Sequence, residues 1–226
     1  MSCGELFNID ALYETGLMAL YGDVTHHGNL LGIEVVPNGA HNLSVDENPA
    51  ELQGNDNVGH YVIYFVNQLN RKERIEAIGH ELGHLLLISK YGLKPDFMFV
   101  QDQGIIQSIQ NVTHHLILVD LLREEYVISS NFHLSLLCKT LGNYLSDKDL
   151  PNDKALRFFE YEKLIGNVEG IPNICTQTKS FQKAYESAAT RFGKYGFKHI
   201  PSPQNYKEDI ISFLKDIGQI GKGCKI

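Results

Sequence analysis

The sequence of 226 residues lacks tryptophan, paired CxxC cysteines and any long hydrophobic run. Its longest unbroken apolar stretch is residues 61–66, far short of the ~20 residues that a membrane helix requires. The four cysteines are widely spaced, which favours reduced thiols over a disulfide framework. The first ten residues contain no Lys or Arg, so no secretory signal is expected. These absences predict a cytoplasmic protein without a membrane segment.

Basic side chains are also absent from the first 70 positions, and the first of them is Arg71. Residues 1–70 carry a formal charge of −9, residues 71–226 carry +2, and the whole chain carries −7. This acidic balance argues against a nucleic-acid-binding face. The acidic segment is either an ordinary solvated surface or a wall beside a site, where it would attract a basic partner.

The spacing of apolar residues predicts one α+β domain over residues 1–226, with a small mixed sheet and a mostly helical C-terminal half. Within it, residues 1–70 form a helix and the sheet, residues 71–128 form two helices, and residues 129–226 form a helical part. The expected helices cover residues 5–21, ending before Gly22, and the regions near 70–91, 106–128, 132–146, 153–165, 178–194 and 204–218. The expected strands cover residues 30–36 and 60–67, with one more short strand within 38–59.

An HExxH motif, HELGH at positions 80–84, lies in the middle of the helix that begins after Asn70. His80 and His84 are four residues apart, so both imidazoles leave the same face of the helix and can bind one Zn²⁺. Glu81 projects beside them, where it can act on a water molecule held by the metal. The motif therefore predicts a zinc site with a general base.

The run GHELGHLLL, which follows the strand YVIYFVN, resembles the active-site helix of zincin metallopeptidases. It is most similar to the small intracellular zinc peptidases of the ImmA/IrrE type, and the specific match covers residues 60–90. The resemblance implies a zincin-like fold with zinc between two helices and an edge strand that binds an extended peptide. It also implies that His80 and His84 are zinc ligands, that Glu81 is the general base, and that the protein cleaves or regulates a protein partner, often a transcriptional repressor.

The third zinc ligand departs from that family, in which it is usually a glutamate on the next helix. No glutamate lies between Glu81 and Glu124, whereas His114 and His115 stand 30 and 31 residues after His84. A metzincin pattern is excluded as well, because positions 87 and 90 are leucine and lysine.

His115 is the expected third ligand, with His114 as the alternative. Asn111 lies four residues before His115, so its amide can orient that ring from the same helix face. Glu124 and Glu125 would lie about 14 Å farther along the helix and would ligate only if the helix began late. The possibility that a carboxylate ligates and both histidines are bystanders stays open.

The motif and the resemblance together predict a zinc-dependent endopeptidase that acts on a protein or peptide substrate, with no nucleic-acid or membrane partner. Residues 61–66 are the expected edge strand for the substrate. His133, Tyr91 and Tyr126 are candidates for stabilising an oxyanion. One alternative is a zinc-containing sensor or interaction protein without turnover, and another is a helical interaction protein with a fortuitous motif.

Overall fold

The computed structural model describes residues 15–28, 32–37, 43–46, 48–55, 59–95, 97, 100, 102–146, 151–166 and 178–220. The chain divides into two compact units. The sheet unit consists of Met1–Gly92 and Leu118–Leu136, and the helical unit consists of Leu93–Ile117 and Leu137–Ile226. Two long helices each contribute residues to both units.

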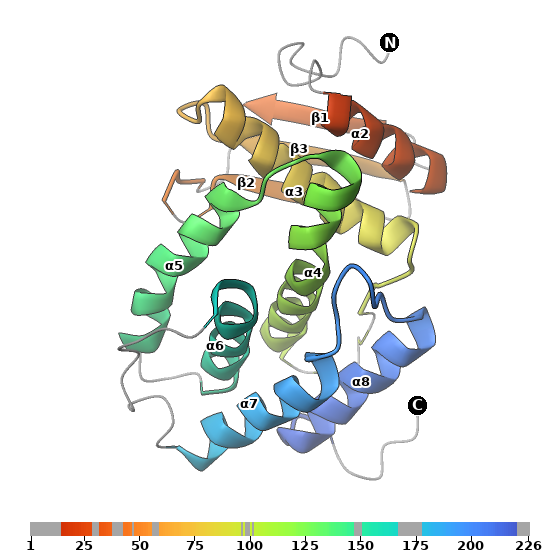
Figure 1. Cartoon of the computed structure of the whole chain (residues 1–226). Coiled ribbons are helices and arrows are strands. Elements are labelled where there is room, and N and C mark those ends of the chain that lie inside the picture. The colour runs from red at the N-terminus through yellow and green to blue at the C-terminus, as the bar shows by residue number, and fades with distance from the viewer. Residues whose placement is uncertain are drawn as a thin grey trace. The chain divides into compact units, whose positions relative to one another are not determined.

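The described elements are three strands and seven helices, labelled in Figure 1. They are α2 (Thr15–Gly28), β1 (Gly32–Pro37), β2 (Ala50–Asn55), β3 (His60–Phe65), α3 (Arg71–Ser89), α4 (Gln103–Tyr126), α5 (Asn131–Ser146), α6 (Pro151–Ile165), α7 (Lys179–Phe192) and α8 (Pro203–Asp216). The expected α+β class, the small mixed sheet and the predominance of helix are confirmed. The extra short strand expected within residues 38–59 is β2.

The sheet has the strand order β1-β3-β2, with β1 parallel and β2 antiparallel to β3. The expectation that residues 61–66 form an edge strand is therefore wrong, because β3 is hydrogen-bonded on both sides. Only one face of β3 is fully buried. Tyr61, Ile63 and Phe65 are buried, while the residues between them are half-exposed. Among the described strands, β1 and β2 form the edges.

Helix α3 begins as its sequence predicts. The Asn70 side chain accepts a hydrogen bond from the Glu73 backbone N–H, and the Glu73 side chain accepts one from the Asn70 backbone N–H. This capping box satisfies two of the N–H groups that have no partner within a helix. The helix packs against α2, β2 and β3 (Figure 1). Its Leu82, Leu85 and Leu86 side chains are buried, so one side of α3 is anchored in the core.

Helix α2 runs to Gly28, so the expected end before Gly22 is wrong. Glycine inside a helix costs roughly 1 kcal/mol relative to alanine, which a continuous buried stripe can offset. Leu17, Leu20 and Val24 form that stripe on both sides of Gly22. The expected first part of this helix, residues 5–14, lies outside the described residues.

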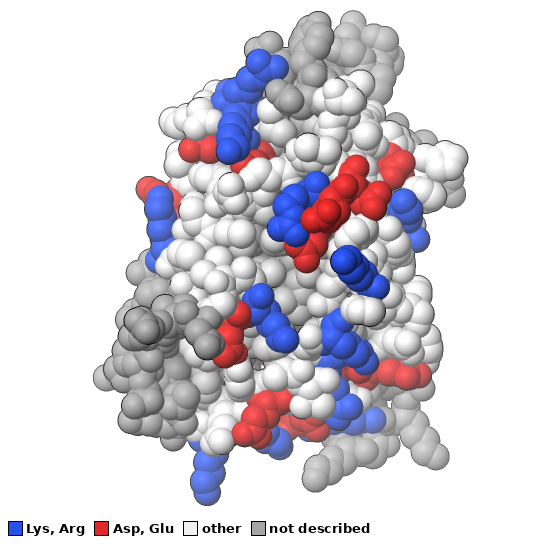
Figure 2. Space-filling view, viewed as in Figure 1, with Lys and Arg blue, Asp and Glu red and all other residues white. Residues whose placement is uncertain are grey.

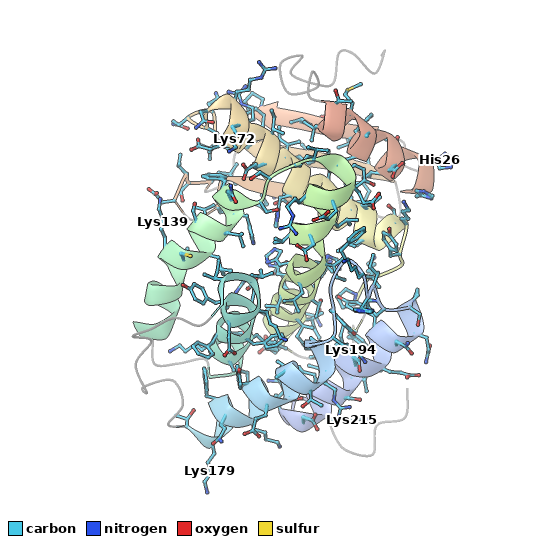
Figure 3. The ribbon with its side chains drawn as sticks, in the orientation of Figure 1. His26, Lys72, Lys139, Lys179, Lys194 and Lys215 are labelled. Carbon is cyan, nitrogen blue, oxygen red and sulfur yellow. The ribbon has the colours of Figure 1, made fainter. Side chains whose placement is uncertain are left out.

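The helical unit packs α6 against α7 and α7 against α8. Ala155 of α6 and Phe181 and Ala184 of α7 form a buried cluster within it. Near the other end of α7, Lys194 lies 2.9 Å from the Asp209 carboxylate of α8. Lys179 and Lys215 lie on the outside of the same two helices (Figure 3). The later predicted helices are confirmed, and most of their ends agree with the expected ends within one or two residues.

Charges of both signs are interspersed over the described residues on the face drawn in Figure 2. Two of the acidic residues of the first 70 positions lie near a basic side chain. Asp23 lies 3.5 Å from Lys90, and Glu34 lies 3.6 Å from His60. None of the helices in the described part of the chain has the length and hydropathy that a membrane span requires.

Candidate metal centre

The first two predicted ligands lie together on α3. The Nε2 atoms of His80 and His84 are 3.1 Å apart, and the two rings meet edge to face. Two nitrogens bound to one tetrahedral zinc at about 2.0–2.1 Å are roughly 3.3 Å apart. The observed separation is close to that value, so these two side chains can bind one ion with little movement.

Two glycines of α3 let other segments of the same chain approach the helix closely near His80 and His84. A Cβ on Gly83 would lie 2.7 Å from the Leu118 side chain, and a Cβ on Gly79 would lie 3.1 Å from that of Ile128. Both partners belong to the sheet unit. The glycine inside the HELGH motif therefore serves packing and holds the His84 backbone against the second half of α4.

Glu81 lies beside the histidines and faces the sheet. Burial raises the pKa of Glu81 to about 8; a hydrogen bond from the backbone N–H of Leu52 lowers it, and the nearby Glu51 carboxylate raises it. Leu52 belongs to β2, an edge strand of the described sheet. A divalent cation on the neighbouring imidazoles would stabilise the ionised carboxylate, as a general base requires.

His115, the predicted third ligand, is held by a carboxylate of the helical unit. Its Nδ1 atom is hydrogen-bonded to Oε1 of Glu160, which is fully buried on α6. The other Glu160 oxygen accepts a hydrogen bond of 2.9 Å from Arg157. Histidines that bind a metal through one ring nitrogen usually donate from the other nitrogen to a carboxylate or carbonyl. The Glu160 contact is of this kind, and it fixes the orientation of the His115 ring.

His114 has a different environment from its neighbour. Its Nε2–H donates to the Leu93 carbonyl oxygen at 2.8 Å, and its side chain is buried. Burial lowers the pKa of His114 to about 4, although the hydrogen bond to Leu93 raises it. A neutral ring that donates to a backbone carbonyl is typical of a histidine that stabilises the core.

His133, near the start of α5, also belongs to this cluster. Its ring stacks on that of His80, with centroids 4.2 Å apart and an angle of 22° between the planes. The sheet unit thus brings the imidazoles of His80 and His133 together, whereas the predicted ligand His115 belongs to the helical unit. Imidazole nitrogens are ligands for zinc and for several other divalent metals, so this donor set fits zinc without excluding the others.

The remaining candidates from the sequence do not join this cluster. Glu124 and Glu125 are exposed on the last turn of α4, and Glu124 pairs with Arg123. The Tyr126 hydroxyl donates to Asp23 at 2.7 Å. The Tyr91 ring lies under the Lys90 ammonium group. These contacts give none of the four a position among the histidines.

Sequence reasoning missed Glu160 and gave His133 only a secondary role. Glu160 is 45 residues from His115, and no local spacing connects them. Asn111, the expected orienting residue, is replaced in that role by Glu160. His133 offered one weak signal, a histidine near the start of the helix that follows the candidate ligands.

Comparisons of the chain with protein-family models, with curated proteins and with solved structures found no match. The zincin resemblance therefore rests on the sequence motif alone.

Proposed function

We propose that this protein is a zinc-dependent endopeptidase similar to the ImmA/IrrE-type enzymes. The observation that carries the proposal is the arrangement on α3, where the His80 and His84 Nε2 atoms lie 3.1 Å apart and Glu81 follows His80 directly. This separation is close to that of two imidazole nitrogens on one tetrahedral zinc, and a carboxylate residue adjoins them in the sequence. The proposed ligands are His80, His84 and His115.

The choice of His115 as third ligand is supported by its hydrogen bond to Glu160. A buried carboxylate fixes the ring tautomer and makes the opposite nitrogen a better donor to a metal. His114 donates its Nε2–H to the Leu93 carbonyl oxygen, so this nitrogen is occupied by a contact with the backbone. The Glu124 and Glu125 carboxylates are exposed to solvent.

In the proposed reaction, Glu81 is the general base. Zinc, when bound, supplies Lewis-acid activation of water and of the substrate carbonyl. Glu81 takes the proton from the attacking water and then donates it to the leaving amine, so that it returns to its starting state. The hydrogen bond from the Leu52 N–H fixes the direction of the carboxylate during both transfers.

The edge of β2 is the proposed place for the substrate backbone. β3 is occupied on both sides, whereas β2 pairs with β3 alone among the described strands. Leu52 of β2 contacts Glu81 through its backbone N–H. A peptide added to this edge would run beside the general base and would be recognised mainly through its backbone.

A non-catalytic zinc protein is the second candidate, and His133 is the observation that favours it. Zinc sites that serve structure have four protein ligands, whereas catalytic sites keep one position open. His80, His84, His115 and His133 together would supply four imidazoles. A protein with all four bound would retain zinc without turning over a substrate.

The experiment that separates these functions compares the proteomes of cells that express the wild type and Glu81→Gln. This substitution keeps the size of the side chain and the zinc ligands but removes the base. Peptides with new termini that depend on Glu81 support the peptidase. Identical proteomes, with zinc bound by both purified proteins, support the non-catalytic alternative.

A further inference from the structure

The start of α5 is attached to α3 by a buried carboxylate. Glu76 is only 5% exposed, and its Oε2 accepts a hydrogen bond of 2.7 Å from the Phe132 backbone N–H. Phe132 is the second residue of α5, where the N–H has no partner within the helix. The side chain of Glu76 thus caps α5 from another helix.

Three successive contacts connect the same stretch of α3 with the start of α5 and the segment just before it. Glu76 binds the Phe132 N–H, Gly79 lies against Ile128, and His80 stacks on His133. Glu76 and His80 are one helical turn apart, and Phe132 directly precedes His133. Fixing the Phe132 N–H on Glu76 therefore fixes the His133 backbone beside the His80 ring.

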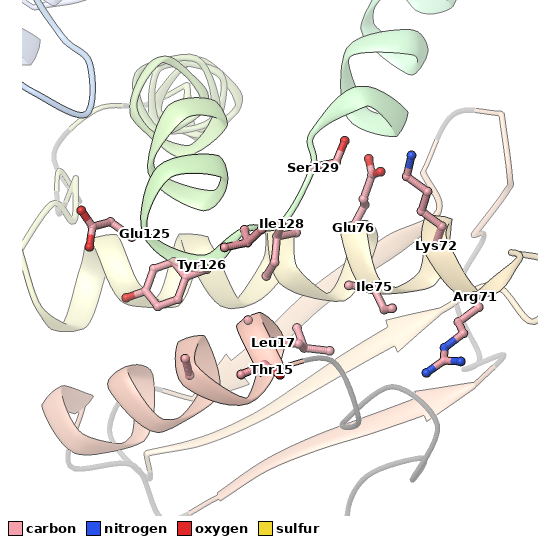
Figure 4. A pocket seen from close by; sticks show the side chains of 13 residues that line it. Thr15, Leu17, Arg71, Lys72, Ile75, Glu76, Glu125, Tyr126, Ile128 and Ser129 are labelled. Atoms are coloured by element: carbon pink, nitrogen blue, oxygen red, sulfur yellow. The ribbon is translucent and has the colours of Figure 1, made fainter.

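Glu76 lies beside a second group that accepts a hydrogen bond from the start of α5. Figure 4 shows the Glu76 side chain rising from α3 beside Ser129, in a cavity of about 640 Å³ within the sheet unit. The Ser129 hydroxyl accepts a hydrogen bond from the Asn131 N–H at 3.1 Å, so it satisfies a neighbouring N–H group of α5. A buried carboxyl group is costly unless it is hydrogen-bonded, and here an N–H group at a helix N-terminus supplies the partner.

We propose that Glu76 is a positioning residue of the metal centre, which holds α5 so that His133 contributes a ligand nitrogen beside His80. The proposal rests on the proposed metal centre and not on turnover. A fourth imidazole is compatible both with a closed zinc site and with a catalytic site that becomes five-coordinate.

The test measures Co²⁺ binding, because the visible absorption of Co²⁺ reports its ligands independently of any activity. The wild type is compared with Glu76→Leu, Glu76→Gln, His133→Ala and the double variant Glu76→Leu/His133→Ala. Glu73→Gln is the matched control, since Glu73 is a capping carboxylate on the same helix that binds the Asn70 N–H instead of α5.

Glu76→Leu should lower Co²⁺ affinity by about 10–100-fold, the usual scale for a residue that orients a ligand, and should change the spectrum as His133→Ala does. Glu76→Gln retains an oxygen acceptor and should stay within roughly threefold of the wild type, as should Glu73→Gln. The double variant should bind Co²⁺ no more weakly than His133→Ala alone, because Glu76 acts through His133.

A Glu76→Leu protein with the affinity and spectrum of the wild type would overturn the inference, as would additive losses in the double variant. If Glu76→Leu does not fold, Phe132→Pro removes the N–H donor while leaving Glu76 in place, and Phe132→Ala controls for the lost ring. Equal Co²⁺ affinities of these two variants would also contradict it. A wild type that binds no Co²⁺ would instead refute the metal centre on which the proposed function depends.

Discussion

The two helices that carry the candidate ligands differ in how their histidines are held. On α3, His80 and His84 meet because they are one turn apart, and nothing outside the helix is needed to bring them together. On α4, His114 and His115 are adjacent and leave the helix in different directions. Their roles are separated by distant partners, the Leu93 carbonyl for one and the Glu160 carboxylate for the other. Local spacing thus defines half of the site, and tertiary contacts define the rest.

The largest effect is expected at Glu81, which lies on α3 with His80 and His84. Glu81→Gln should retain zinc and folding but lose at least ~10²-fold in turnover, the lower end of what a general base contributes. Cleavage of a substrate identified from the proteome comparison, measured with the purified proteins, checks this. Undiminished turnover would refute the role of Glu81.

The second effect concerns the two histidines of α4. His115→Ala should lower zinc affinity by well over tenfold, measured by competition with a chelator. His114→Ala should leave zinc affinity nearly unchanged while lowering the free energy of unfolding by about 1–3 kcal/mol, because the Leu93 carbonyl loses its partner.

The double variant Glu124→Ala/Glu125→Ala is the control for a carboxylate ligand and should bind zinc as the wild type does. If that variant loses zinc and His115→Ala retains it, the third ligand has been assigned to the wrong residue. Circular dichroism confirms folding in each case.

A smaller effect is expected at Glu160, the distant partner of His115. Glu160→Gln preserves volume but removes the negative charge, and should lower zinc affinity by about 10–100-fold. Glu162→Gln is a matched control on the same helix, since Glu162 accepts a hydrogen bond from Tyr185 instead. Equal zinc affinities of the two variants would show that the Glu160 charge does not act on the metal centre.

The smallest effect concerns the acidic first 70 residues, which should attract a basic substrate. Association should slow as ionic strength rises from roughly 20 to 300 mM, because salt screens charge interactions over ~10 Å at 0.1 M. Stopped-flow binding of a basic peptide measures this, and a neutral peptide of the same length is the control. Equal salt dependence of the two peptides would contradict an attraction between the acidic segment and a basic substrate.

The parts of the molecule that local pattern determines could be predicted from the sequence. The capping box at Asn70, the buried leucines of α3 and the helical spacing of His80 and His84 all depend on neighbours within a few turns. The central position of β3 could not be predicted, because strand order depends on pairing between distant segments. Gly22 misled the prediction of α2, since burial across the glycine outweighs its low helix propensity.

The carboxylate contacts of the site were unpredictable for the same reason. Glu160 meets His115 across 45 residues, and Glu76 meets Phe132 across 56. Each is a charged residue that the sequence alone would place on a solvated helix face. Only the folded chain reveals that both are buried, Glu160 against His115 and Glu76 against the start of α5.

Metal analysis of the purified wild-type protein tests the central claim most directly. The protein is prepared without chelators, and its zinc content is measured by mass spectrometry beside that of a His80→Ala/His84→Ala protein of confirmed folding. The account predicts close to one zinc per chain in the wild type and a large loss in the variant, because α3 supplies two of the ligands. A wild type without zinc or any other divalent metal, or a variant that retains the same amount, would contradict it.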